Sequence, residues 1–167
     1  MRFGPSLLVE TVRTLERRAS AVLSLPEFNV VVFALLLNFP WEVLQAPFYA
    51  GMTTAPHWPA SLLCARATLG DAVMTIAAYW LVALVSRDRN WIASPTRTQG
   101  LAFVAITIAT YGAMEKLAIA TGRWAYETAM AIVPLVHVGL SPIIQGAILA
   151  PLTVWFVRRQ MNRAGGA

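Results

Sequence analysis

Long apolar stretches constrain this chain more than any other feature. Residues 28–49, 60–86 and 99–121 are each long enough to cross a bilayer, which requires about 20 apolar residues in a helix. Charged residues make up only 13 % of the chain, whereas a soluble domain carries roughly 25 %. We therefore predict an all-α, polytopic membrane protein, folded as a four-helix bundle.

The fourth apolar stretch, from Glu127 to Phe156, is too long for one upright helix and too short for two helices and a turn. Ser141-Pro142 divides it, since serine is a good N-cap and proline is favoured at the first helical position. We predict a short half-helix at 126–133, an irregular link at 134–141 and a last span at 142–157. Irregular backbone within a bilayer must lie against protein or a wet cavity.

The region before the first span has a different pattern. Residues 6–24 place apolar side chains on one helical face and charged ones opposite, which predicts an amphipathic helix on the membrane surface, ended by Pro26. Acidic and basic residues recur along this region before any long apolar stretch, which is unlike a cleavable signal peptide. The predicted organisation is an interfacial segment at 1–27, the membrane bundle at 28–158 and a tail at 159–167.

Basic residues give the orientation. They cluster before the first span, between the second and third, and after the fourth, and the opposite side carries far fewer. By the positive-inside rule we expect both termini in the cytoplasm of a bacterial-type inner membrane. Because the basic residues flank apolar runs, we interpret the net charge of +5 as a topology signal, with the lipid bilayer as partner and no nucleic acid.

Polar residues recur at helical spacing within every span. Residues three, four and seven apart share one face of a helix, so each span has one polar stripe. The carboxyl groups on these stripes belong to Glu42, Asp71 and Glu115, and we name them as candidate catalytic residues. The candidate substrate-binding residues are Asn38, Gln45, Tyr49, Arg66, Tyr79, Tyr111, Lys116, Trp124, Tyr126, His137, Ser141 and Gln145.

The three carboxyl groups also share a depth. At about 1.5 Å per residue they lie between the bilayer middle and the non-cytoplasmic face. An ionisable residue in a span costs ~2.5 to 3.5 kcal/mol, so such groups are paired, protonated or functional. One interpretation is that Arg66 and Lys116 pair with them to hold the helices together. The other is a polar cavity for a ligand or reaction, which the number of additional polar groups at this depth favours.

The sequence gives less support to a metal site, a cofactor site or a catalytic histidine or cysteine. The sequence has two histidines and one cysteine, so we expect no metal and no cofactor. His57 is expected at the membrane interface, and His137 is expected to satisfy the irregular link rather than act as an acid or base. Cys64 is expected to be buried filler.

The segment Gly122-Arg123-Trp124-Ala125-Tyr126, followed by Met130, Pro134 and 138–145, resembles the membrane-embedded lycopene cyclases of bacteria and fungi. This resemblance implies redox-neutral chemistry, in which a buried carboxylic acid protonates an alkene and aromatic faces stabilise the cation. Ile143, Ile144 and Gln145 stand where that family has an acidic pair, so the acid would come from Glu42, Asp71 or Glu115.

Three function classes follow. The first is a protein that binds, cyclises or isomerises an apolar, isoprenoid or carotenoid-like molecule by acid-base chemistry, and whether it is an enzyme stays open. The second is a non-catalytic subunit of a larger membrane complex, such as a pigment or electron-transfer complex, with a membrane protein as partner. The third is a small proton-coupled transporter, which would need a polar route to the cytoplasm.

Overall fold

The computed structural model describes residues 10, 14 and 21–164. Four helices in this part of the chain are long and apolar enough to cross a membrane: Pro26–Phe48, His57–Ser86, Arg97–Ala120 and Leu140–Arg163. The chain therefore has the architecture of a multi-pass helical membrane protein, as the apolar stretches predicted. The interfacial helix expected at 6–24 falls mostly outside the described residues and stays a prediction.

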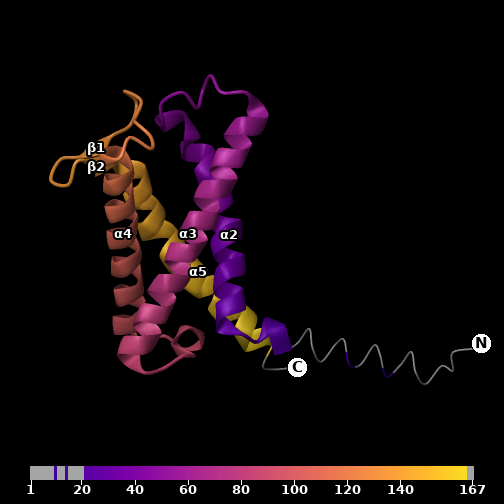
Figure 1. Ribbon diagram of the computed structural model, residues 1–167. Coiled ribbons are helices and arrows are strands. Elements are labelled where there is room, and N and C mark those ends of the chain that lie inside the picture. The colour runs from indigo at the N-terminus through magenta and orange to yellow at the C-terminus, as the bar shows by residue number, and fades with distance from the viewer. Residues whose placement is uncertain (1–9, 11–13, 15–20, 165–167) are drawn as a thin grey trace, which may run out of the picture.

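The helices form a bundle in which consecutive members run in opposite directions (Figure 1). Helix α2 (Pro26–Gln45), continued by the short η1 (Ala46–Phe48), packs on α3 (His57–Ser86) and on α5 (Leu140–Ala164). Helix α4 (Arg97–Ala120) packs on α3 and α5. In Figure 1, α5 passes obliquely behind the other helices, and it packs on α2 and α4.

The two ends of the bundle differ. We call the end where α2 begins and α5 finishes the basic end, because the linker between α3 and α4 and the last turns of α5 place their arginines there (Figure 1). The arginines concerned are Arg87, Arg89, Arg97, Arg158, Arg159 and Arg163. We call the opposite end the hairpin end. The described start of α2 and the finish of α5 therefore lie at the same end of the bundle.

Local sequence explains where the helices begin and end. Pro26 occupies the first turn of α2, where its missing N–H costs nothing. Thr96 and Gln99 form a capping box at the start of α4, each side chain bonding the other residue's backbone N–H. Arg87 ends α3 in the left-handed conformation, with φ of 53°.

The predicted half-helix at 126–133 is wrong. The segment between α4 and α5 contains a small antiparallel hairpin, β1 (Ile132–Val133) with β2 (Val138–Gly139), paired Ile132↔Gly139 and Val133↔Val138. β-Branched side chains favour extended backbone, and Pro134 cannot continue a helix. Helix α5 consequently begins directly after the hairpin, at Leu140 rather than at Pro142.

An apolar core fills the basic half of the bundle. Its largest fully buried side chains are Trp91, Tyr79 and Phe103, with Val30 and Val157 beside them. Trp91 lies on η2 (Trp91–Ala93) and folds back between the helices, where its ring is 5.5 Å from Phe103. Its indole N–H donates to the Tyr79 carbonyl at 3.2 Å, so the linker is fixed to α3.

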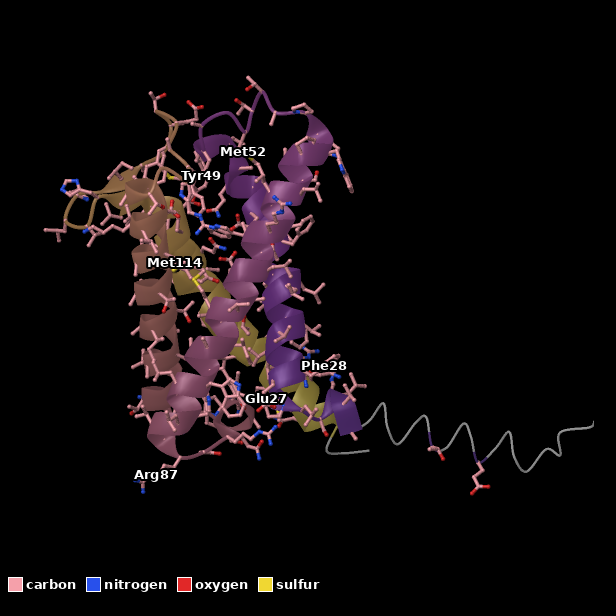
Figure 2. The ribbon with its side chains drawn as sticks, in the orientation of Figure 1. Glu27, Phe28, Tyr49, Met52, Arg87 and Met114 are labelled. Carbon is pink, nitrogen blue, oxygen red and sulfur yellow. The ribbon has the colours of Figure 1, made fainter. Side chains whose placement is uncertain are left out.

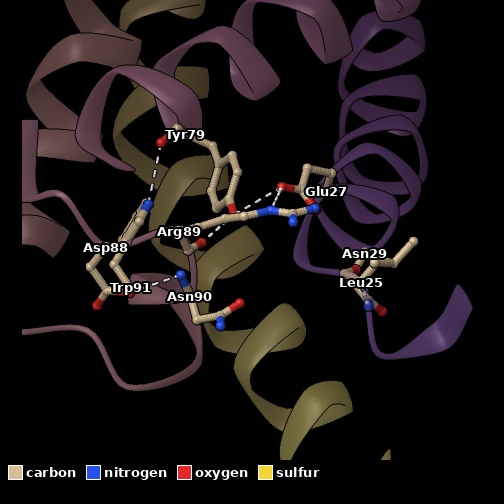
Figure 3. A network of polar contacts seen from close by, with 8 residues as sticks. All are labelled: Leu25, Glu27, Asn29, Tyr79, Asp88, Arg89, Asn90 and Trp91. Carbon is tan, nitrogen blue, oxygen red and sulfur yellow. Dashed lines mark hydrogen bonds and ion pairs between the residues drawn. The ribbon is translucent and has the colours of Figure 1, made fainter. Parts of the chain in front are cut away.

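A polar network closes the basic end outside this core (Figure 3). Arg89 makes a two-bond ion pair with Glu27, with N–O distances of 2.7 and 3.1 Å. The Tyr79 hydroxyl donates to the Arg89 carbonyl, and Asn29 donates to the Leu23 and Leu25 carbonyls. The Glu27–Arg89 pair connects the start of α2 to the linker between α3 and α4, and the Asn29 bonds fix the residues just before α2.

The packing of Phe103 against Trp91 supports a first prediction. Phe103→Ala removes a fully buried ring and leaves a cavity, so we expect a loss of about 3 kcal/mol in unfolding free energy. Leu101→Ala is the matched control, because Leu101 lies on the same helix and is 71 % exposed. Denaturation in mixed detergent micelles measures both variants. Equal midpoints for the two would contradict this description of the core.

Candidate functional site

The hairpin half of the bundle contains the polar side chains that the stripes predicted. In Figure 2, nitrogen and oxygen atoms gather between the helices below Tyr49, near the level of Met114. The stripe residues Asn38, Glu42 and Gln45 are buried on α2, and Thr68, Asp71 and Thr75 are buried on α3. The phase of each stripe was thus sufficient to indicate which face of α2 and α3 is inward.

Gln145 of α5 lies at the centre of this cluster and is 2 % exposed. Its side-chain nitrogen donates to Asn38 Oδ1 at 2.9 Å, to Glu42 Oε1 at 3.1 Å and to Asp71 Oδ2 at 3.1 Å. Tyr111 of α4 donates from its hydroxyl to the same Asn38 oxygen at 3.1 Å. One amide group therefore connects α5 to α2 and α3, and Asn38 extends the network to α4.

Gln45 forms a second junction, closer to the hairpin end. Its side-chain nitrogen donates to Glu42 Oε1 at 2.6 Å and to Gln145 Oε1 at 3.2 Å. Its oxygen accepts from Ser141 Oγ at 2.8 Å and from Trp41 Nε1 at 3.2 Å. Both groups of the Gln45 amide are used, so its orientation is set by four separate partners.

Two carboxyl groups face each other inside this network. Glu42 and Asp71 are 9 % and 7 % exposed, and both carboxyl groups converge on Gln145, whose side-chain nitrogen lies 3.1 Å from Glu42 Oε1 and 3.1 Å from Asp71 Oδ2. Among the described residues, every buried side-chain nitrogen or oxygen has a hydrogen-bond partner. The cluster is consequently a saturated network, in which amides and hydroxyls supply the donors.

The expected cationic partners are not part of the network. Arg66 and Lys116 are both exposed, and in the part of the chain that the structure describes the ion pair is Arg89 with Glu27 at the basic end. The prediction that Arg66 and Lys116 pair with the carboxyl groups is therefore wrong. Both residues lie on the outer faces of α3 and α4, where a long side chain extends along the lipid toward the headgroups.

Glu115 forms a separate aromatic subsite with the loops of the hairpin end. It is 5 % exposed, and its Oε1 accepts from Tyr49 at 3.1 Å and from Trp124 Nε1 at 3.2 Å. The Tyr49 ring meets Trp124 edge-on at 6.1 Å and Tyr126 at 5.8 Å. Glu115 is thus covered by three aromatic rings.

The two loop tyrosines retain their protons. Burial, followed by the nearby Glu115 charge, raises the pKa of Tyr49 above its ordinary value. Burial also raises the pKa of Tyr126, the Gly139 N–H partly offsets this rise, and the nearby Glu115 charge adds to it. Tyr126 also accepts from the Gly139 backbone N–H at 2.6 Å, so it fixes the base of the hairpin.

Backbone pairing joins the two loops above this subsite. Ala50 N donates to the Ala125 carbonyl at 2.9 Å, and Glu127 N donates to the Phe48 carbonyl at 2.9 Å. The pair brackets a β-bridge between Tyr49 and Tyr126. The loop after α2 and the loop after α4 therefore close the bundle together.

Two further candidates lie elsewhere. Tyr79 is in the apolar core of the basic half, because its position on α3 is too far along the helix to reach the carboxyl groups. His137 is exposed at the tip of the hairpin, with φ of 53°. The structure brings neither residue to the carboxyl network.

One member of the network was absent from our candidates. Trp41 bonds Gln45, four residues later on the same helix, so the spacing that identified the stripe also indicated this tryptophan. As for metals, the described residues contain no group of three or more His, Cys, Asp or Glu side chains placed to hold an ion.

Comparison with known proteins adds no family assignment. No protein-family model matches the chain, and neither the curated proteins nor the solved structures gave a match. The similarity to lycopene cyclases consequently stays a resemblance of short motifs.

Gln145 provides a test of the network. Gln145→Ala removes a donor shared by three acceptors on two helices. Asn38 and Glu42 keep their bonds from Tyr111 and Gln45, whereas Asp71 Oδ2 loses its donor, and leaving a buried acceptor unpaired costs about 1–3 kcal/mol. We expect that loss in the unfolding free energy in detergent. The control is Ile144→Ala on the same helix, where Ile144 is 37 % exposed. A Gln145 variant no less stable than the control would show that the network is not formed.

Proposed function

We propose that this protein is a membrane-embedded acid-base site for an apolar, isoprenoid-like molecule, with Glu42 and Asp71 as the proton-transferring pair. The observation that supports this most is the convergence of the two buried carboxyl groups on one amide nitrogen, among neutral amides and a phenol. Two ionised carboxylates this close repel each other, and among the described residues no cation pairs with them, so we assign a proton to one of the two. The pair thus holds one proton and one site able to accept a proton.

This arrangement suits a redox-neutral rearrangement. The protonated carboxyl group of the pair adds its proton to one carbon of a C=C bond, and the π electrons form the new C–H bond. The adjacent carbon becomes a cation, which either closes a ring with a second C=C bond or stays in place. A carboxylate of the cluster then removes a proton from a neighbouring carbon, and that C–H electron pair forms the product alkene.

Glu115 and its aromatic neighbours support the cationic stage. Tyr49, Trp124 and Tyr126 offer ring faces and edges around a buried carboxyl group at the hairpin end. Cations are attracted to such faces by about 0.5–2 kcal/mol. We assign Glu115 to orienting these rings and to balancing the developing positive charge.

The apolar core below the network argues for a site that opens toward the lipid or the hairpin end. Between the network and the basic end, the interior is filled by Val30, Tyr79, Phe103 and Trp91. A transporter needs a polar route through this region. These side chains fill the region, so the transporter interpretation has less support. The non-catalytic subunit stays a prediction, which co-purification with a partner in mild detergent would favour.

We also propose that the basic end faces the cytoplasm of a bacterial-type inner membrane. The arginines of the α3–α4 linker and of α5 gather at that end, and positively charged loops are retained in the cytoplasm. The network then lies in the outer half of the bilayer.

The orientation is testable with reporter fusions. A green fluorescent protein fused after the last residue should fluoresce, and alkaline phosphatase inserted in the hairpin turn at 134–137 should be active. The reverse pair, with alkaline phosphatase at the C-terminus and the fluorescent protein in the turn, is the control and should give neither signal. Signals from the reverse pair would place the basic end outside.

The acid-base role is tested by single amide substitutions. Glu42→Gln and Asp71→Asn keep shape and hydrogen bonding but remove the transferable proton, so each should reduce turnover at least a hundredfold, the scale of general acid-base catalysis. The assay uses membranes supplied with lycopene or a polyprenol in D2O, and it measures deuterium in the isomerised or cyclised product. Infrared difference spectra of the carboxyl C=O band, between pH 5 and 9, report the shared proton directly.

Glu127→Gln is the matched control for this assay. Glu127 belongs to the loop after α4, and its carboxyl group accepts only from the Gly51 N–H, at 3.3 Å. This variant should retain activity and the carboxyl band. Unchanged product formation in both Glu42→Gln and Asp71→Asn, or a wild type that incorporates no deuterium, would end the acid-base proposal.

A further inference from the structure

A groove runs along the outer face of α4 beneath the hairpin and is separate from the carboxyl network. Its volume is about 390 Å³, within the range of ligand pockets. The α4 side is formed by small or aliphatic residues, including Ala109, Gly112 and Ala113. Val136 and Val138 of the hairpin region cover one side, and Ile143 of α5 closes the bottom.

The wall between the groove and the network depends on one glycine. A Cβ atom at Gly112 would lie 3.3 Å from Ile143 Cδ1, so the absence of a side chain lets Ile143 approach α4 closely. Glu115, on the neighbouring face of α4, is buried and bonds Tyr49 and Trp124 in the aromatic subsite. The groove therefore opens outward, toward the lipid, and an occupant need not contact the carboxyl pair.

The groove is apolar except at one end, where it has a charged side chain. Lys116 is the single charged residue in its lining, and it lies at the side of the hairpin end. Lys116 is also the only lysine in the sequence. It is exposed, and the ion pair that the described residues form is at the other end of the bundle. A cation at one end of an apolar groove is complementary to an anionic amphiphile.

The length and direction of the groove match those of a lipid in one leaflet. From Lys116 to Ile108 the helix rises about 12 Å, toward the middle of the bilayer. Lys116 is four residues before the end of α4, so its amine reaches the interface at the hairpin end by extending along the helix. A lipid of that leaflet has its headgroup at this level and its chain directed inward.

We propose that this groove binds one anionic phospholipid, with its phosphate at Lys116 and one acyl chain along Ala109, Gly112 and Ala113. The aliphatic hairpin residues then act as a clasp that distinguishes this lipid from those that surround the bundle. This inference does not depend on the acid-base function, since it concerns the outer face of α4.

The test uses native mass spectrometry of the full chain, extracted in mild detergent from vesicles of equal phosphatidylglycerol and phosphatidylcholine. The wild type should retain one phosphatidylglycerol in preference to phosphatidylcholine. Lys116→Gln should reduce that preference by roughly fivefold, the effect of one cation beside an anionic lipid. Arg123→Gln is the control, because Arg123 is exposed at the same end and stacks on Trp124 outside the groove.

Filling the groove separates a bound lipid from general attraction to the membrane surface. Ala109→Phe, and the milder Ala113→Leu, place bulk at exposed positions of α4, so they should reduce retention of both lipids while the thermal midpoint is kept. A second readout is the ¹³C signal of reductively methylated Lys116, which should shift with phosphatidylglycerol and not with millimolar inorganic phosphate.

Three results would overturn the proposal. They are an unchanged lipid preference in Lys116→Gln, full lipid retention in both groove-filling variants, and an equal ¹³C shift with inorganic phosphate. None of them affects the Glu42 and Asp71 assay, and a failed acid-base assay leaves the lipid result intact.

Discussion

The need to satisfy buried carboxyl groups without water determines much of this structure. In a bilayer a polar group that lacks a protein partner costs several kcal/mol, so a carboxyl group inside a span requires donors from neighbouring helices. Gln145 supplies them to Glu42 and Asp71, and its own oxygen accepts from Gln45. The amide can do this only if α2, α3 and α5 keep their present rotation and depth.

The network is structural, and we propose that it is functional as well. Hydrogen bonds between membrane helices average about 0.6 kcal/mol each, so no single one holds the bundle. Their shared geometry is more restrictive than their energy, because one side-chain nitrogen must reach three acceptors. Simple adhesion does not require two carboxyl groups on one amide nitrogen, and that convergence is the reason for proposing a proton-transfer role.

The two halves of the bundle divide these tasks. The basic half packs aromatic and aliphatic side chains around Trp91 and fixes the helix ends through the Glu27–Arg89 ion pair. The hairpin half contains the carboxyl groups and closes with paired loops. A rigid apolar half beneath a polar half keeps the carboxyl groups remote from the basic end, and this separation suits chemistry on a molecule that enters from the lipid.

The hairpin shows where sequence patterns are insufficient. Residues 126–139 contain apolar side chains without a decisive period, so a half-helix and a hairpin were both compatible with them. The hairpin depends on contacts with distant residues, such as the Tyr126 hydroxyl under Gly139 and the backbone pairing of Ala50 with Ala125. The same dependence explains Trp91, whose ring enters the core because the linker bends back over Phe103.

The sequence by itself determined the number of spans, their approximate limits and the inward faces of α2 and α3. Those properties follow from segment length, hydropathy and the helical period, which act within one segment. Only the tertiary structure decided that Gln145 joins the carboxyl groups, that Tyr79 and His137 lie far from them, and that Arg66 and Lys116 face outward. The physical reason is that the relative depth and rotation of separate helices are set by contacts between them, and no periodicity within a single helix records those contacts.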